Sequence, residues 1–189
     1  MTKSTRLRFA GPVKRPSPRQ GVRHELLSDL PHNIELEQAL LGILLISNAS
    51  YQRVSRLVTP ADFYDPLHGR LFEAIGDLIA KNSPAMPLAL TPFFEGEMVG
   101  PQSVLQYLRR LVAAATTAVN AEHHAAAIAD LKRRRELASI AANLVRSALH
   151  DFTASLEAQI AAAEAKFYLI TPTVPPNQTK ALPYKEKPT

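Results

Sequence analysis

Apolar residues recur at helical spacing along most of the chain between residues 33 and 170, and no segment shows a credible strand pattern. The clearest stretch begins at Asn33, which stands where a helix cap is expected. Glu35 and Glu37 follow in the first turn, where acids favour the positive end of the helix dipole. Leu36 opens an apolar stripe that ends before Ser47. This pattern predicts a central amphipathic helix.

Several later segments carry the same kind of start signal. Thr59–Pro60 and Asp65–Pro66 each place a capping side chain before a proline, and Ser103 precedes another apolar stripe. Each signal predicts a helix. His68 lies one turn into the helix that starts after Asp65, and we expect it to be packed or to cap rather than to act as a base.

The longest stripe begins near Asn120 and runs to about Leu149. Four residues, 150–153, then reverse the chain, and a last helix runs to about Phe167 with Leu156, Ile160 and Ala163 on its inner side. Two long helices with so short a link predict an antiparallel hairpin. A protruding hairpin leaves apolar surface to be covered by a second copy or a partner. The candidate protein-interface residues are Leu144, Leu149, Leu156 and Ile160.

The fold class that follows is all-α: a small helical head, an antiparallel helical hairpin and two disordered tails. The predicted boundaries are a basic arm over 1–28, the head over 29–118, the hairpin over 119–170 and a proline-rich tail over 171–189. The ends are assigned as tails because prolines interrupt them and no apolar period runs through them.

Composition narrows the class of protein further. The chain has no Cys, which excludes disulfides and thiolate metal sites. No apolar run approaches the ~20 residues that a membrane-spanning helix requires, and the basic N-terminus has no apolar segment typical of a secretory signal. We therefore expect a cytoplasmic protein without a membrane partner.

The net charge of +5 is concentrated in the N-terminal arm, which holds seven Lys and Arg residues before its first acid, Glu25. Such an arm can contact nucleic-acid phosphates, or it can be a solvated tail that aids solubility. Any DNA contact through it is expected to be weak and independent of sequence. The candidate contact residues are Arg6, Arg8, Lys14, Arg15 and Arg19.

Motifs that carry catalytic chemistry are missing from the 189 residues. The phosphate-binding pattern G-x-x-x-x-G-K-[ST] does not occur, since no glycine is followed by Lys. His123 and His124 are adjacent on a predicted helix and point about 100° apart, which disfavours a shared metal ion. We expect no catalytic, cofactor-binding or metal-ligating residue in this chain.

A run of four basic residues, Lys132–Arg135, lies within the longest predicted helix. Four consecutive residues cover the whole circumference of a helix, so one of them must face the side on which the helix packs. Either one pairs with an acid near the core, or the helix leaves the globular body at this point. Contact with nucleic-acid phosphates is the functional alternative.

The sequence resembles the N-terminal domain of DnaB-type replicative DNA helicases. The resemblance is carried in order along the chain by Pro31-His32-Asn33-Ile34-Glu35, Glu37-Gln38-Ala39-Leu40-Leu41-Gly42, Asp62-Phe63-Tyr64-Asp65-Pro66-Leu67-His68, Leu71-Phe72-Glu73-Ala74-Ile75, Leu90-Thr91-Pro92-Phe93-Phe94-Glu95, Asn120-Ala121-Glu122 and Arg134-Arg135-Glu136-Leu137. A similar helical fold occurs at the helicase-binding end of primase, so the fold alone does not separate the two. The blocks before Gly42 and around Tyr64 favour the helicase side.

This resemblance implies a collar domain that acts in DNA replication. In helicases of this family such domains pair and assemble into a ring. The ring supports the helicase motor and offers a docking surface for primase or a helicase loader. ATP and Mg²⁺ belong to the motor of the full-length family and are not expected in this chain. Two other hypotheses remain: a stand-alone adaptor that modulates a replicative helicase or primase, and a weak nucleic-acid binder through the arm.

Overall fold

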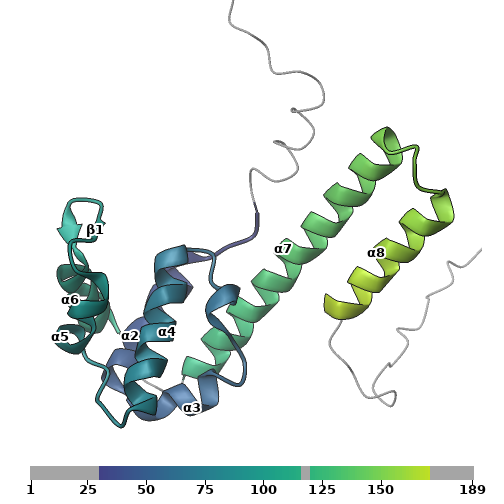
Figure 1. Ribbon diagram of the computed structural model, residues 1–189. Helices are drawn as coiled ribbons and strands as arrows, with labels where there is room; N and C mark the ends of the chain where they lie inside the picture. Colours follow the sequence, from purple (N-terminus) through teal and green to yellow (C-terminus); the bar gives the residue numbers. More distant parts are fainter. Residues whose placement is uncertain (1–29, 116–119, 171–189) are drawn as a thin grey trace, which may run out of the picture.

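A computed structural model describes residues 30–115 and 120–170; the predicted arm over 1–28 and tail over 171–189 lie outside these ranges. The described elements are mostly helical (Figure 1). In chain order they are α2 (Ile34–Ile46), η1 (Asn48–Ser50), α3 (Tyr51–Val54), η2 (Pro60–Asp62), α4 (Pro66–Ala80), α5 (Pro87–Leu90), η3 (Thr91–Phe94), β1 (Met98–Val99), β2 (Gln102–Ser103), α6 (Val104–Ala114), α7 (Ala121–His150) and α8 (Leu156–Ile170). The prediction of an all-α protein is confirmed.

The helices begin at the capping residues that the sequence indicates. The Asn33 side chain accepts a hydrogen bond from the amide of Leu36 at 2.9 Å, and Asp65 caps α4 in the same way. Ser103 and Gln106 form a reciprocal capping box at the start of α6. These side chains satisfy amide groups that the first turn of a helix leaves without partners.

The expectation that the chain contains no strand is wrong at one place. β1 and β2 form a short antiparallel pair in which Met98 lies opposite Ser103 and Val99 opposite Gln102. Gly100 lies in the connecting turn with φ +61°, a conformation that favours glycine. Each strand has two residues, which is too short for an alternating pattern to be recognised in the sequence.

The core of the head, which we define as residues 30–115, is built around α2. Leu40, Leu41 and Leu44 are fully buried, and α2 packs against α4, α6 and α7. Gly42 permits a very close approach of α6, since a Cβ atom at this position would lie 2.5 Å from the carbonyl oxygen of Leu111. Gly42 is therefore needed for the close contact between α2 and α6 and not only for α2 itself.

α7 connects the head to α8, and we define α7 and α8 together as the hairpin. Its first turns pack on the head through Ala121, Ala125 and Ile128, which are at most 1% exposed. After the turns that are packed on the head, α7 extends away from it, and α8 returns alongside α7 (Figure 1). Among the described residues, no helix is both long and apolar enough to cross a lipid bilayer.

Candidate protein-interaction site

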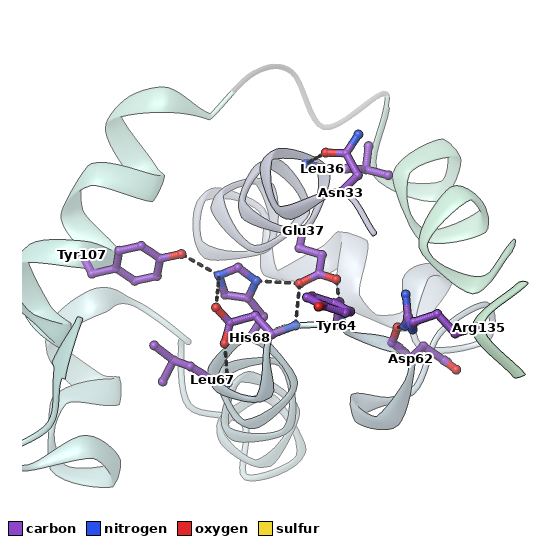
Figure 2. A network of polar contacts seen from close by, with 10 residues as sticks. Asn33, Leu36, Glu37, Asp62, Tyr64, Leu67, His68, Tyr107 and Arg135 are labelled. Atoms are coloured by element: carbon purple, nitrogen blue, oxygen red, sulfur yellow. Dashed lines mark hydrogen bonds and ion pairs between the residues drawn. The ribbon is translucent and has the colours of Figure 1, made fainter. Parts of the chain in front are cut away.

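A buried polar cluster joins three helices at the centre of the head (Figure 2). His68 of α4 is 0% exposed, and its two ring nitrogens contact a Glu37 carboxylate oxygen at 2.7 Å and the Tyr107 hydroxyl at 2.5 Å. Glu37 comes from α2 and Tyr107 from α6. The burial of Tyr107 raises the pKa of its phenol, so this group is a neutral hydrogen-bonding partner.

Glu37 also fixes the segment that precedes α4. Its carboxylate accepts a hydrogen bond from the amide of Tyr64 at 2.7 Å and another from the amide of Asp65 at 3.3 Å. A buried carboxylate is stable only when its oxygens have such partners. Glu37, His68 and Tyr107 are at most 2% exposed, and their contacts join three helices of the head. His68 is packed, as the sequence analysis expects.

Arg135, the last residue of the basic run, binds α7 to the head. Its guanidinium donates to the carbonyl oxygens of Pro31 at 3.0 Å and Asp62 at 2.5 Å, and it lies 5.6 Å from the centre of the Tyr64 ring. Figure 2 shows Arg135 reaching toward Asp62 and Tyr64 from α7. Tyr64 in turn stacks on His32, with ring centres 4.1 Å apart.

The other members of the basic run pair with acids of α7 itself. Arg134 bonds to Asp130 at 2.7 Å, and Lys132 contacts Glu136 at 3.3 Å. The hydrogen bond from Arg134 lowers the pKa of the Asp130 carboxyl. The inward-facing residue is Arg135, and its partners are carbonyl oxygens and an aromatic ring. Of the two alternatives given by the sequence, pairing with an acid near the core is therefore wrong.

The candidate interface residues of the hairpin differ in exposure. Leu149, Leu156 and Ile160 are 58%, 63% and 45% exposed, and Leu144 is half-buried. The inner side predicted for the last helix is therefore wrong for Leu156 and Ile160, because α8 packs on α7 through the small residue Ala163, which is buried. Other exposed apolar residues, which the sequence analysis did not single out as interface, are Leu137, Val145, Phe152, Tyr168 and Leu169.

A groove of about 400 Å³ lies between α7 and α8. Leu144 and Ala163 contribute apolar surface to it, while Arg146 and Lys166 are among its polar lining residues. Gln159 also lines the groove and donates a hydrogen bond to the carbonyl oxygen of Asp151 at 2.8 Å. The two helices thus leave part of their facing surfaces open.

The remaining candidates from the sequence are not part of this surface. His123 and His124 lie in the first turn of α7, where burial, followed by the neighbouring His123, lowers the pKa of His124. Within residues 30–115 and 120–170, no group of three His, Asp or Glu side chains could hold a metal ion. The five candidate DNA-contact residues between Arg6 and Arg19 lie outside the described residues.

Comparison with known proteins gives one consistent family. The sequence profile of the DnaB-like helicase N terminal domain matches residues 29–130. The replicative DNA helicase DnaB of Rickettsia prowazekii is 31% identical over 144 residues, which cover 75% of this chain and 30% of that protein. The DnaB of Rhodothermus marinus is 36% identical over 107 residues, which cover 56% of this chain and 11% of that protein. The chain therefore spans less than a third of the length of these curated relatives.

A solved structure agrees with the sequence relatives. The crystal structure of the N-terminal domain of DnaB helicase from Mycobacterium tuberculosis superposes with a TM-score of 0.66 at 26% sequence identity. The match covers 74% of this chain and 99% of that chain. The head and the hairpin thus occur together in a domain of known structure.

Proposed function

Because this chain belongs to the DnaB-like helicase N-terminal domain family, we propose that it is an assembly and docking module of a replicative DNA helicase. In this proposal the chains associate through their hairpins, and the resulting assembly supports a helicase motor and offers a surface to primase or a helicase loader. The region shared with the full-length relatives is their N-terminal part, which is not the catalytic part of those helicases.

The observation that carries this proposal is the exposed apolar surface of the hairpin. Leu149, Phe152 and Leu156 are 58%, 86% and 63% exposed around the end of the hairpin that is farthest from the head (Figure 1). Exposed side chains of this size on neighbouring turns are typical of a surface that is covered in an assembly. Because α7 and α8 are only two helices, a second hairpin would complete a four-helix bundle.

Replacing Leu156 by Asp is expected to weaken self-association by roughly tenfold to a hundredfold. Burying a leucine contributes about 1.5–3 kcal/mol, and each 1.4 kcal/mol changes an association constant tenfold. Light scattering across a concentration series measures the effect on molecular mass. Leu88→Asp is the matched control, since Leu88 is 67% exposed but lies on the head in α5.

We expect both the wild-type protein and Leu88→Asp to show a mass above the 20.7 kDa of one chain. At equal concentration, the measured mass of Leu156→Asp should be lower. A wild-type mass of one chain at high concentration would contradict self-association. An equal loss for both variants would show that the surface of the head contributes as much as the hairpin, and no loss for Leu156→Asp would place the interface elsewhere.

The proposal assigns no ATP hydrolysis to this chain. The sequence lacks the G-x-x-x-x-G-K-[ST] pattern that binds nucleotide phosphates. ATP and Mg²⁺ would act in a motor that is associated with this module, as in full-length members of the family. DNA-dependent ATP hydrolysis by the purified chain would contradict this assignment.

A second candidate function, weak DNA binding, is favoured by the charge of the chain. Seven Lys and Arg residues precede Glu25, although acids outnumber basic residues between 30 and 170. Each phosphate that the arm neutralises on duplex DNA should add about −0.9 to the slope of log affinity against log salt.

Deleting residues 1–24 is expected to abolish DNA binding at low salt without changing helicity or self-association. Fluorescence anisotropy with two duplexes of unrelated sequence measures affinity and its independence of sequence. If the truncated chain still binds DNA, the run Lys132–Arg135 is the next candidate. If the full chain does not bind, the arm is a solubilising tail.

A further inference from the structure

Arg135 lies on the same face of α7 as the residues that pack this helix on the head. Ala121, Ala125 and Ile128 follow one another at spacings of four and three, and Arg135 comes seven residues after Ile128. Residues seven apart in an α-helix lie on one side, two turns apart. Arg135 therefore continues the packed side of α7 beyond the apolar core.

The guanidinium of Arg135 joins α7 to two separate segments of the head. It donates to the carbonyl oxygen of Pro31, just before α2, and to the carbonyl oxygen of Asp62, at the end of η2. Figure 2 shows Arg135 beside Asp62. A planar guanidinium can donate along two fixed directions at once, whereas a lysine ammonium is a point charge on a flexible stem. This contact depends on arginine rather than on positive charge alone.

The part of the head that receives Arg135 is itself held in place. The amide of Tyr64 donates to the buried carboxylate of Glu37 at 2.7 Å, and the Tyr64 ring stacks on His32 with an angle of 11° between the rings. The ring that faces Arg135 is thereby fixed from its backbone and from one of its faces. Because Arg135 binds to this fixed part of the head, it fixes the position of α7 relative to the head.

The effect of Arg135 on the direction of the hairpin follows from the length of α7 that is in contact with the head. The fully buried apolar residues of α7 that face the head extend from Ala121 to Ile128, about 10 Å at 1.5 Å per residue. With Arg135 the held length becomes about 21 Å. Since the angular freedom of a rod falls as the held length grows, this contact should halve it.

We propose that Arg135 is a positioning residue that sets the direction in which the hairpin leaves the head. Where the chains associate through their hairpins, which is the function proposed above, this direction also sets where each head lies in the assembly. The role of Arg135 within one chain does not depend on that function.

A distance measurement within single chains tests the proposal. The sequence contains no Cys, so Arg109→Cys on α6 and Ala148→Cys near the end of α7 provide two unique sites for spin labels. Both positions are exposed. Labelled chains are diluted into excess unlabelled protein so that distances between chains do not contribute, and electron–electron double resonance gives the distance distribution.

Arg135→Ala and Arg135→Lys are expected to broaden the distribution roughly twofold, because the held length of α7 is halved. Arg134→Ala is the matched control and should leave the width unchanged, since Arg134 bonds to Asp130 of its own helix. Circular dichroism checks that each variant retains the helicity of the wild type. If Arg135→Ala unfolds the head, Arg135→Lys decides the question.

An unchanged width in the folded Arg135 variants would overturn the proposal, as would equal broadening in Arg134→Ala. Light scattering on the same samples separates this outcome from failure of the proposed function. A monomeric wild type with a narrow distribution and broadened Arg135 variants contradicts assembly but supports the role of Arg135. If the wild type assembles but the Arg135 variants keep the narrow distribution, the result supports assembly and contradicts the role of Arg135.

Discussion

Replacing Glu37 by Ala is expected to destabilise the protein by about 3–5 kcal/mol, a large part of the total stability of an ordinary domain. The change removes the acceptor for two amides, those of Tyr64 and Asp65, and the partner of His68. The hydrogen bonds from the two amides are half-buried and the contact with His68 is buried, and each unsatisfied donor costs about 1–3 kcal/mol. The midpoint of thermal unfolding should fall by about 10–15 °C.

Glu35→Ala is the matched control for this prediction. Glu35 and Glu37 both lie in the first turn of α2, so both carboxylates interact favourably with the helix dipole. Glu35 is exposed, whereas Glu37 is 2% exposed. We expect Glu35→Ala to cost less than ~1 kcal/mol. Similar losses for both variants would show that the buried contacts of Glu37 contribute little.

Gly42→Ala is expected to destabilise the head by about 1–3 kcal/mol, although alanine is a better helix former than glycine by ~1 kcal/mol. The new methyl group would lie 2.5 Å from the carbonyl oxygen of Leu111 and 3.1 Å from the Cβ atom of Ala115. A main-chain carbonyl inside α6 cannot move away without shifting that helix. Chemical denaturation followed by circular dichroism measures the change.

Gly76→Ala, within α4, provides the comparison. A Cβ atom there would overlap the hydroxyl and Cζ of Tyr51, which belong to the end of a half-buried side chain and not to the main chain of a helix. The Tyr51 side chain can shift without moving a helix, and the gain in helix propensity opposes the cost of that shift, so we expect a smaller loss than for Gly42→Ala. If both glycine variants behave alike, the close approach of α2 and α6 does not determine the stability of the head.

Local signals explain why the helices could be predicted from the sequence. Asn33, Asp65 and Ser103 each cap a helix within a few residues of their own position, and the apolar stripes follow directly. Such information is contained in a window of about one or two helical turns. The reversal between α7 and α8 was likewise visible, since it interrupts two long stripes.

The contacts that hold these helices together could not be predicted in the same way. His68 lies 31 residues from Glu37 and 39 residues from Tyr107, and Arg135 lies 104 residues from Pro31. Nothing local to these residues indicates their partners. The sequence did indicate that a run of four basic residues must present one of them to the packed side of α7.

The candidate interaction surface was predicted only in part. Apolar periodicity identified Leu149, Leu156 and Ile160, but their exposure depends on how α8 packs against α7, and this contact is made by the small residue Ala163. Phe152 and Tyr168 escaped the prediction because neither belongs to a regular stripe. Both are more than 80% exposed, and they extend the apolar surface of the hairpin.

The central claim, that chains associate through the hairpin, is tested most directly by the reactivity of a single cysteine placed on each surface. Leu149→Cys reports on the hairpin, and Leu88→Cys reports on the head; both leucines are more than half exposed in the single chain. The rate of maleimide labelling is measured in dilute and in concentrated protein, with light scattering on the same samples. If the hairpins associate, Cys at position 149 reacts more slowly as the mass rises, while Cys at position 88 reacts at one rate throughout. Equal rates at position 149 in dilute and associated samples would contradict the central claim.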